Sequence, residues 1–183
     1  PAETLVIEDV TSPVVKGHGV KVRVKAAGLN FPDTLIIEGK YQLKPTMPFS
    51  PGGEMSGEVI EVGEKVTRFK PGDRVAGLTG YGAFAEEVVV PEQNILPIPE
   101  SMSDEKAAAF SMVYGTSYYA LKQRANIQPG ETLLVLGASG GVGLATVELG
   151  KAMGAHVIAA ASTAEKLAVA KEAGADELIN YSE

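Results

Sequence analysis

The sequence predicts an α/β-plus-β protein, with a β-rich domain over residues 1–100 and the first half of a doubly wound parallel sheet over residues 101–183. Short strand-like segments separated by turn signals fill the first part. Strands alternate with helices in the second part. A glycine-rich turn, Gly137–Gly143, joins one of those strands to the helix that follows it. We therefore place the domain boundary between residues 100 and 101.

In the first domain, Val20–Ala26 alternates apolar and polar residues with the period of a half-buried strand. Similar segments are residues 58–62, 74–77 and 84–90, and turn signals lie at 16–19, 70–73 and 79–80. Strands this short and this closely spaced favour a small barrel or sandwich. One short helix is expected between Asn30, near its N-cap, and Gly39, just beyond its end.

The second domain begins with a helical pattern that Ser103 caps and that is interrupted near Gly115. Strands and helices then follow in the order 132–136, 142–153, 156–160, 163–173 and 177–180. This alternation predicts parallel strands joined by right-handed crossovers. Three such strands make only half of a doubly wound sheet and leave an apolar edge unpaired. We therefore expect the chain to be part of a longer enzyme.

Composition excludes several classes of function. The formal net charge is −7 and the pI is about 5.0, so nucleic acid and anionic membranes are not expected partners. The absence of cysteine excludes disulfides, thiolate zinc sites and a cysteine nucleophile. A cytoplasmic location agrees with this composition.

The glycine turn has the layout of a phosphate-binding loop. A buried strand, a turn spelled Ala138-x-Gly140-x-x-Gly143 and a helix lie in succession. A helix N-terminus presents unpaired N–H groups and a positive dipole end to phosphate. The residues expected to hold a dinucleotide pyrophosphate here are Ser139, Gly140, Gly141, Val142 and Gly143.

The end of the next strand favours NADPH over NADH. Enzymes that prefer NADH usually place an acid there to bind the ribose 2′-hydroxyl. Residues 159–164, from the end of that strand up to Glu165, contain no acid. Ser162 offers a hydroxyl there and Lys166 a positive charge, which together suit a 2′-phosphate. The alternative is that Ser162 caps a helix and Lys166 is a solvated side chain.

Several stretches, in order along the chain, resemble the medium-chain dehydrogenase/reductase superfamily and, within it, the zinc-free NADPH:quinone oxidoreductase family. They are Ala26–Asp33, Pro51–Val59, Phe69–Val75, Gly115–Leu121, Gly137–Leu144, Ala173–Asp176 and Ile179–Tyr181. The resemblance implies a GroES-like β-barrel catalytic domain followed by an NADP-binding Rossmann domain. It also implies a homodimer for the full-length protein.

The resemblance further implies that the chain binds no metal. Zinc-dependent relatives ligate zinc at the positions that here hold Asn30, Gly53 and Met112, and these side chains do not form a competent zinc site. We interpret His18 and His156 as incidental.

By the same resemblance, Asn30 and Thr116 line the nicotinamide and substrate side. Tyr41 borders the acceptor pocket and is a candidate donor to a developing oxyanion, and Tyr181 joins the 2′-phosphate site. Each has a structural alternative: Asn30 as a helix cap, Thr116 as a buried helix residue, and Tyr41 as a tyrosine packed in a loop.

These residues predict a zinc-free, NADPH-dependent oxidoreductase that reduces quinones or related α,β-unsaturated carbonyls. Two alternatives stay open. One is a 2-enoyl-thioester reductase of the same superfamily, and the other is a non-catalytic, crystallin-like NADPH-binding protein.

Overall fold

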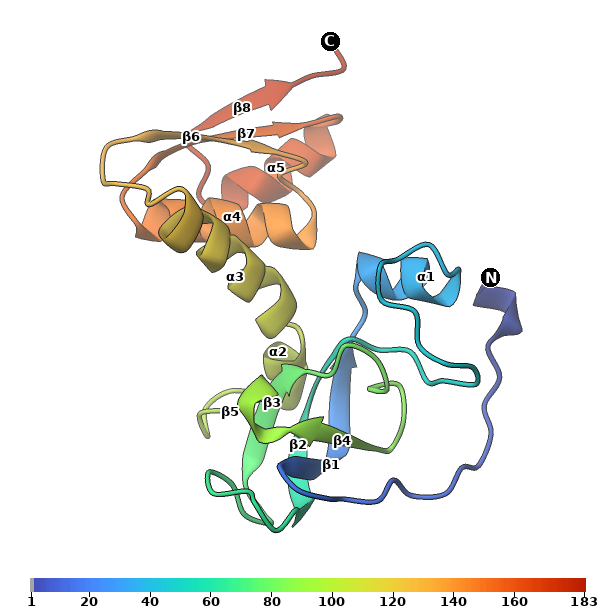
Figure 1. Ribbon diagram of the computed structural model, residues 1–183. Helices are drawn as coiled ribbons and strands as arrows, with labels where there is room; N and C mark the ends of the chain where they lie inside the picture. The colour runs from blue at the N-terminus through green and yellow to red at the C-terminus, as the bar shows by residue number, and fades with distance from the viewer. Residues whose placement is uncertain (1) are drawn as a thin grey trace. The chain divides into compact units, whose positions relative to one another are not determined.

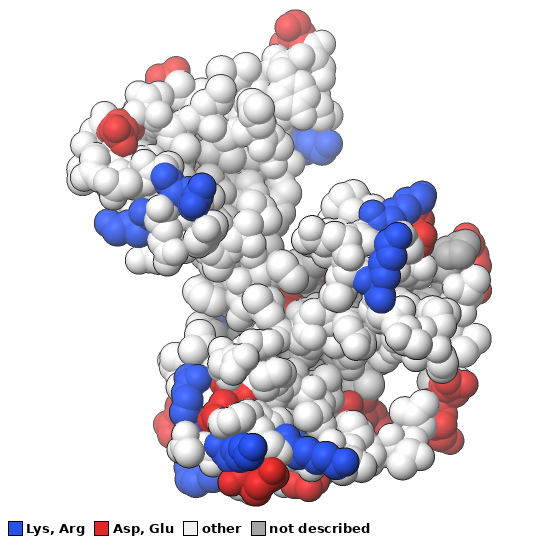
Figure 2. Space-filling view, in the orientation of Figure 1, with Lys and Arg blue, Asp and Glu red and all other residues white. Residues whose placement is uncertain are grey.

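The structure, a computed structural model, describes residues 2–183 (Figure 1). The chain forms two compact units, one ending at Ser111 and the other running from Met112 to Glu183. In the part of the chain that is described, no helix is long and apolar enough to cross a membrane. On the face seen in Figure 2, the basic side chains of the first unit lie among acidic ones.

The first unit is built on one antiparallel sheet in the spatial order β4-β1-β2-β3-β5. Its strands are β1 (Gly19–Gly28), β2 (Glu54–Val62), β3 (Arg74–Leu78), β4 (Glu87–Pro91) and β5 (Ile95–Pro97). The expected β-rich domain is confirmed, but the expected barrel is not closed. Over the described residues, β4 and β5 pair on one side only, so the sheet has two open edges.

Alternating burial along the strands forms the core of this unit. Val20 and Val22 on β1 are fully buried, whereas Arg23 between two valines is exposed. The core cluster consists of Val20, Val22, Met55, Val59, Phe69, Val75, Ala83, Val88, Val90 and Ile95. Period-two alternation therefore places one face of the sheet in the core, as the sequence predicts.

Short helices complete the first unit: η1 (Ala2–Thr4), α1 (Phe31–Ile37), η2 (Glu92–Asn94) and α2 (Asp104–Ala108). Asn30 occupies the N-cap position of α1, and Gly39 lies beyond its end with a positive φ of 67°. Ser103 caps α2, where its side chain accepts a hydrogen bond from the Lys106 N–H.

The division between the units falls after Ser111, whereas the sequence places the domain boundary after residue 100. The difference arises because α2 packs against the sheet of the first unit. Ser56 Oγ donates to the Asp104 carbonyl at 2.6 Å, and the Arg74 guanidinium binds the Asp104 carboxylate at 3.0 Å.

The second unit holds a parallel sheet in the order β6-β7-β8. Its elements are α3 (Ser111–Tyr118), a π-helical turn η3 (Tyr119–Arg124), β6 (Thr132–Leu136), α4 (Gly141–Ala152), β7 (His156–Ala161), α5 (Ala164–Glu172) and β8 (Glu177–Asn180). The predicted half of a doubly wound sheet is confirmed. The expected helix break near Gly115 is wrong, because α2 ends before residue 110 and α3 continues through Gly115.

Helices α4 and α5 cover one face of this sheet (Figure 1). Val135, Val147, Val157, Ala159 and Ala170 fill the space between helices and strands. On the opposite face, the side chains of Leu134 and Leu136 are exposed. Because β6, β7 and β8 are parallel, their carboxyl ends meet at one edge of the sheet.

Candidate active site

The glycine turn leaves the carboxyl end of β6 and leads directly into α4. Gly137 has a positive φ of 62°, and the Gly140 N–H closes the turn on the Gly137 carbonyl at 3.1 Å. Gly140 is the N-cap, and the helical ladder begins with the Leu144 N–H bonded to the Gly140 carbonyl at 2.8 Å. The first-turn N–H groups of α4 therefore have no partner within the helix, as an anion site requires.

Gly140 and Gly143 have different roles in this turn. A Cβ at Gly143 would lie 2.4 Å from the Gly137 carbonyl oxygen, so no side chain is compatible with the turn as it stands. A Cβ at Gly140 would meet its nearest neighbour, the same oxygen, only at 3.6 Å. Gly143 therefore serves the fold, whereas Gly140 leaves the space in front of the helix end open.

Helix α3 supports the loop through Ser117, a residue that sequence analysis missed. Ser117 is buried, and its Oγ donates to the Val142 carbonyl at 3.1 Å. Thr146 Oγ1 lies 2.7 Å from the same carbonyl, to which its hydroxyl donates, and 3.0 Å from Ser117 Oγ. Because the two hydroxyls hold the first turn of α4 from its carbonyl side, the N–H groups keep their direction.

Thr116, beside Ser117, is exposed, so its alternative as a buried helix residue is excluded.

A second helix-to-helix bond of α3 involves Tyr114. The Tyr114 hydroxyl donates to the Glu148 carboxylate on α4. This hydrogen bond raises the pKa of Tyr114, with burial adding to the effect. The hydroxyl is therefore committed to holding α3 against α4.

Ser162 and Lys166 lie together beyond the carboxyl end of β7. The Lys166 ammonium donates to Ser162 Oγ at 3.2 Å, and Lys166 is exposed. Thr163, not Ser162, is the N-cap of α5, since Thr163 Oγ1 accepts from the Lys166 N–H at 3.4 Å. The alternative in which Ser162 caps this helix is wrong, because Ser162 lies one residue before the cap.

Tyr181 follows β8 at the same edge of the sheet. Its N–H donates to the Ala161 carbonyl at 3.2 Å, which fixes the Tyr181 backbone beside the residue that precedes Ser162. Its side chain is exposed. The glycine turn, Ser162, Lys166 and Tyr181 thus belong to one edge of one sheet, where doubly wound folds bind nucleotides.

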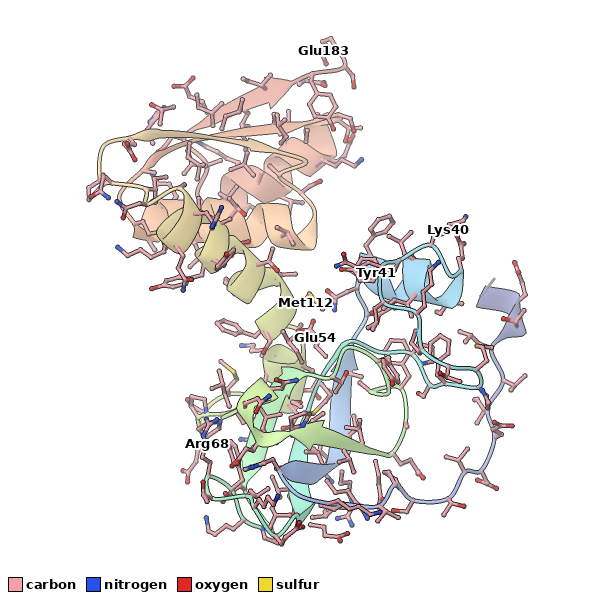
Figure 3. The ribbon with its side chains drawn as sticks, viewed as in Figure 1. Lys40, Tyr41, Glu54, Arg68, Met112 and Glu183 are labelled. Carbon is pink, nitrogen blue, oxygen red and sulfur yellow. The ribbon has the colours of Figure 1, made fainter. Side chains whose placement is uncertain are left out.

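Asn30 and Tyr41 belong to the first unit. Asn30 joins β1 to α1; its backbone N–H donates to Asp33 Oδ2 at 2.8 Å and its Nδ2 donates to Glu54 Oε1 at 2.8 Å. Asp33 and Glu54 are each only 2% exposed. Tyr41 lies in the loop after α1 and is half-buried (Figure 3). The three catalytic candidates are therefore divided between the units, with Asn30 and Tyr41 in the first and Thr116 in the second.

The positions that correspond to zinc ligands in metal-dependent relatives hold other contacts. The Gly53 carbonyl accepts the Thr79 N–H at 2.9 Å, and the Asn30 carboxamide binds Glu54. Within residues 2–183, no group of three or more His, Cys, Asp and Glu side chains could hold a metal ion. His18 binds Glu92 at 2.9 Å, and His156 binds Glu177 at 2.7 Å.

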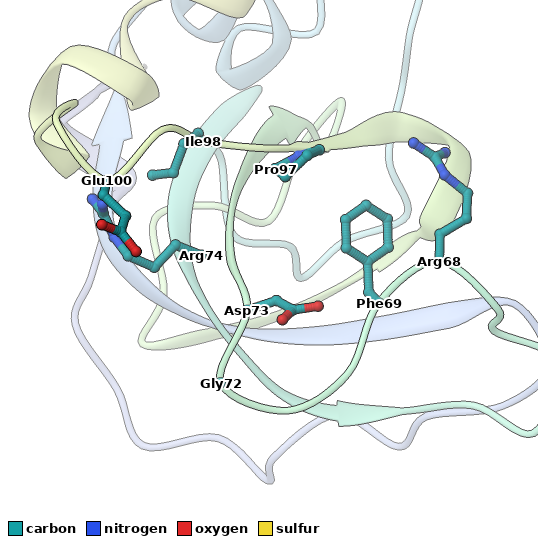
Figure 4. Close-up of a pocket in the computed structure, with 8 residues that line it drawn as sticks. All are labelled: Arg68, Phe69, Gly72, Asp73, Arg74, Pro97, Ile98 and Glu100. Carbon is teal, nitrogen blue, oxygen red and sulfur yellow. The ribbon is translucent and has the colours of Figure 1, made fainter.

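A pocket of about 600 Å³ lies in the first unit, away from these candidates (Figure 4). Its lining residues are Arg68, Phe69, Gly72, Asp73, Arg74, Pro97, Ile98 and Glu100. Arg74 donates to the Met102 carbonyl and to Asp104, while Arg68 donates to the Glu92 carbonyl and lies over the Phe69 ring. Both guanidinium groups are thus used in the unit's own structure, and the Asp104 carboxylate offsets the charge of Arg74.

Comparison with known proteins agrees with this architecture. Residues 16–100 match the family described as an alcohol dehydrogenase GroES-like domain, and residues 141–183 match the family described as a zinc-binding dehydrogenase. The chain is 46% identical over 179 residues to quinone oxidoreductase-like protein 2 of Bos taurus, covering 97% of this chain and 51% of that protein. It thus spans about half the length of the curated relatives it matches.

Solved structures give the same result. The quinone oxidoreductase of Pseudomonas syringae superposes with a TM-score of 0.93 at 44% identity, covering 99% of this chain and 56% of that one. The Escherichia coli quinone oxidoreductase complexed with NADPH gives 0.89 at 36% identity, covering 96% and 54%. The CurK enoyl reductase gives 0.87 at 28% identity, covering 96% and 55%.

A GroES-like domain followed by part of a Rossmann-like parallel sheet defines the architecture of the medium-chain dehydrogenases/reductases. Within that class, the chain belongs to the quinone oxidoreductase family.

Proposed function

We propose that the protein is an NADPH-dependent, zinc-free oxidoreductase that transfers hydride to quinones or related α,β-unsaturated carbonyls. The observation on which this rests most is the sheet edge of the second unit. There an open glycine turn at a helix N-terminus and the Ser162–Lys166 pair lie at one edge, and no acid ends β7.

The residues of this edge suit NADPH. The N–H groups of Ser139 and of the first turn of α4, at Gly141, Val142 and Gly143, bind the pyrophosphate. The Gly140 N–H is bonded to the Gly137 carbonyl, so Gly140 contributes the open space in front of the helix end instead of a donor. Ser162, Lys166 and Tyr181 bind the 2′-phosphate, for which an exposed ammonium supplies the matching charge. The structure of the Escherichia coli quinone oxidoreductase, a complex with NADPH, supports this assignment.

Bound NADPH supplies the hydride, and the protein supplies orientation. Asn30 and Thr116 orient the nicotinamide and the acceptor. Tyr41, half-buried beyond α1, donates a hydrogen bond to the oxyanion that forms on the reduced carbonyl.

A quinone or enone is already electrophilic and needs no Lewis acid to accept hydride. The donor set at Asn30, Gly53 and Met112 lacks the thiolate, imidazole and carboxylate groups that bind zinc in proteins. We therefore propose a zinc-independent reaction, although one matching family is described as zinc-binding. A homodimer, a small-molecule substrate as the partner and a cytoplasmic location stay predictions.

A 2-enoyl-thioester reductase is the second candidate, and similarity to the CurK enoyl reductase favours it. Both candidates share the cofactor site and differ in the acceptor.

Initial rates of NADPH oxidation with 1,4-benzoquinone, a simple enone and a crotonyl thioester, measured on the full-length protein, distinguish the candidates. The proposal predicts the highest kcat/KM for the quinone or the simple enone. A preference for the crotonyl thioester would support the second candidate. Cofactor binding without turnover of any acceptor would support a non-catalytic, crystallin-like role.

A further inference from the structure

A buried carboxylate, Glu54, is hydrogen-bonded to Asn30, one of the catalytic candidates. Glu54 is the first residue of β2 and pairs with Gly28, the last residue of β1. Asn30 follows two residues later, and its Nδ2 donates to Glu54 Oε1 at 2.8 Å. We propose that Glu54 is a positioning residue that acts through Asn30, by holding its carboxamide in the orientation that binds the reactants. The part of Asn30 in this proposal rests on the proposed function above.

The backbone of β1 makes room for this carboxylate. A Cβ at Gly28 would lie 2.5 Å from Glu54 Oε1, 2.8 Å from its Cγ and 2.7 Å from the Ala108 carbonyl oxygen. The Glu54 side chain therefore lies over the bare backbone of Gly28, from where it reaches the turn that begins α1. The observed conformation of Glu54 therefore requires a glycine at position 28.

Asn30 is fixed from two sides. Asp33 Oδ2 accepts its backbone N–H at 2.8 Å, which holds the main chain at the start of α1. Glu54 holds the side chain. A carboxylate oxygen accepts hydrogen bonds, so the amide nitrogen of Asn30 faces Glu54. Asn30 Oδ1 is the oxygen of the α1 capping box, and its second lone pair can accept from the carboxamide of the nicotinamide.

A carboxylate is a costly choice for so buried a position. Removing an ionisable group from water is unfavourable, and an uncharged side chain of similar volume often gives equal or greater stability. Glu54 is only 2% exposed, at the start of a strand whose next residues are buried as well. The hydrogen bond to Asn30 gives a glutamate at this position a role in orienting that side chain.

The proposal is tested on the full-length protein by exchanging the hydrogen-bond donor at position 30 and the acceptor at position 54. Asn30→Asp alone places two carboxyl groups side by side. Glu54→Gln alone leaves two carboxamides, either of which can donate the hydrogen bond to the other. We expect each single variant to lower kcat for quinone reduction about tenfold, the size of one charge-assisted hydrogen bond. The double variant again pairs one donor with one acceptor between positions 30 and 54, and we expect it to recover most of the lost kcat.

Glu92→Gln is the matched control. Glu92 is also a buried carboxylate, and it binds His18 and the N–H groups of Thr67 and Arg68. Glu92 lies in η2, where its N–H binds the His18 carbonyl just before β1, whereas Asn30 lies beyond the other end of β1. A strand of this length separates the two residues by ~30 Å. We expect the control to lower Tm and leave kcat unchanged, whereas Glu54→Gln lowers kcat and leaves Tm unchanged or raised. A double variant no more active than Asn30→Asp would overturn the proposal.

A readout without turnover separates this proposal from the proposed function. In the ¹⁵N-labelled protein without cofactor, the side-chain amide signals of Asn30 report its hydrogen bond directly. We expect Glu54→Leu, or Glu54→Gln if the leucine variant does not fold, to shift these signals and to accelerate their hydrogen exchange. Unchanged signals would overturn the positioning role. Absence of NADPH oxidation with shifted signals would contradict the function and leave the positioning role supported.

Discussion

The Lys166 ammonium lies 3.2 Å from Ser162 Oγ, across the turn that joins β7 to α5. The serine hydroxyl holds the lysine near the strand end without neutralising its charge, because the hydroxyl is uncharged. The cation is thus already directed to the place where the second ribose of a dinucleotide lies in doubly wound folds.

Replacing Lys166 by alanine is expected to weaken NADPH binding about tenfold and to leave NADH binding unchanged. The physical reason is the loss of one charge-assisted contact to the 2′-phosphate, which NADH lacks. Isothermal titration calorimetry with both cofactors measures the effect. Lys171→Ala is the control, since the Lys171 ammonium binds the Ala175 and Asp176 carbonyls at the far end of α5. Equal loss of affinity for both cofactors would contradict the 2′-phosphate assignment.

Alanine at Gly140 and alanine at Gly143 are expected to fail in different ways. Gly143→Ala places Cβ 2.4 Å from a carbonyl oxygen, so we expect it to lower Tm. Gly140→Ala meets only an ordinary contact at 3.6 Å, so we expect Tm to change little. We expect NADPH affinity to fall, because the methyl group would enter the space that we assign to the pyrophosphate. Thermal unfolding and cofactor titration on both variants distinguish the two effects. Full NADPH affinity in Gly140→Ala would contradict the pyrophosphate assignment.

Removing the Tyr41 hydroxyl is expected to lower kcat for quinone reduction by a factor of about 10 to 100, with little change in the affinity for NADPH. The hydrogen bond that it donates strengthens as charge develops on the acceptor oxygen. Steady-state kinetics of Tyr41→Phe give the kcat and KM changes separately. Tyr81→Phe is the control, because the Tyr81 ring packs edge-on against Phe49, 6.1 Å between centroids. If both variants retain full kcat, Tyr41 is only a loop residue.

Acid is expected to weaken the second unit through Asp176. The Lys151 ammonium, 2.7 Å away, lowers the pKa of Asp176, and the Val157 N–H contributes in the same direction. A carboxyl whose folded-state pKa is lowered stabilises the fold above its unfolded pKa of about 3.9 and loses that contribution as the pH falls through the folded pKa. Asp176→Asn is therefore expected to be less stable than wild type at neutral pH, with the difference shrinking below about pH 4. Urea unfolding across this range measures it, and a difference independent of pH would exclude this ion pair as the cause.

The fold was predictable wherever a local pattern decides it. The alternation at Val20 and Val22, and the strand, glycine turn and helix around Gly140, needed no long-range information. The open edges of the first sheet were not predictable, because alternation identifies strands and leaves their order undetermined. The continuous helix through Gly115 depends on contacts of α3 with α4, such as Ser117 with Val142, which override a weak helix former.

The candidate site was predictable only in its sequence-local part. Ser162 and Lys166 are four residues apart, so one helical turn brings them together. Glu54 and Ser117 were missed because their partners lie 24 and 25 residues away in the sequence. No local pattern marks Glu54, because the residues that follow it, Met55, Ser56 and Gly57, are buried in the structure but do not form an apolar run in the sequence.

The most direct test is the rate of NADPH oxidation by 1,4-benzoquinone in full-length protein treated with a strong metal chelator. The account predicts that turnover persists without metal and that, at equal subsaturating cofactor, NADPH supports a higher rate than NADH. Loss of activity on chelation with recovery on adding Zn²⁺, or equal rates with the two cofactors, would contradict it.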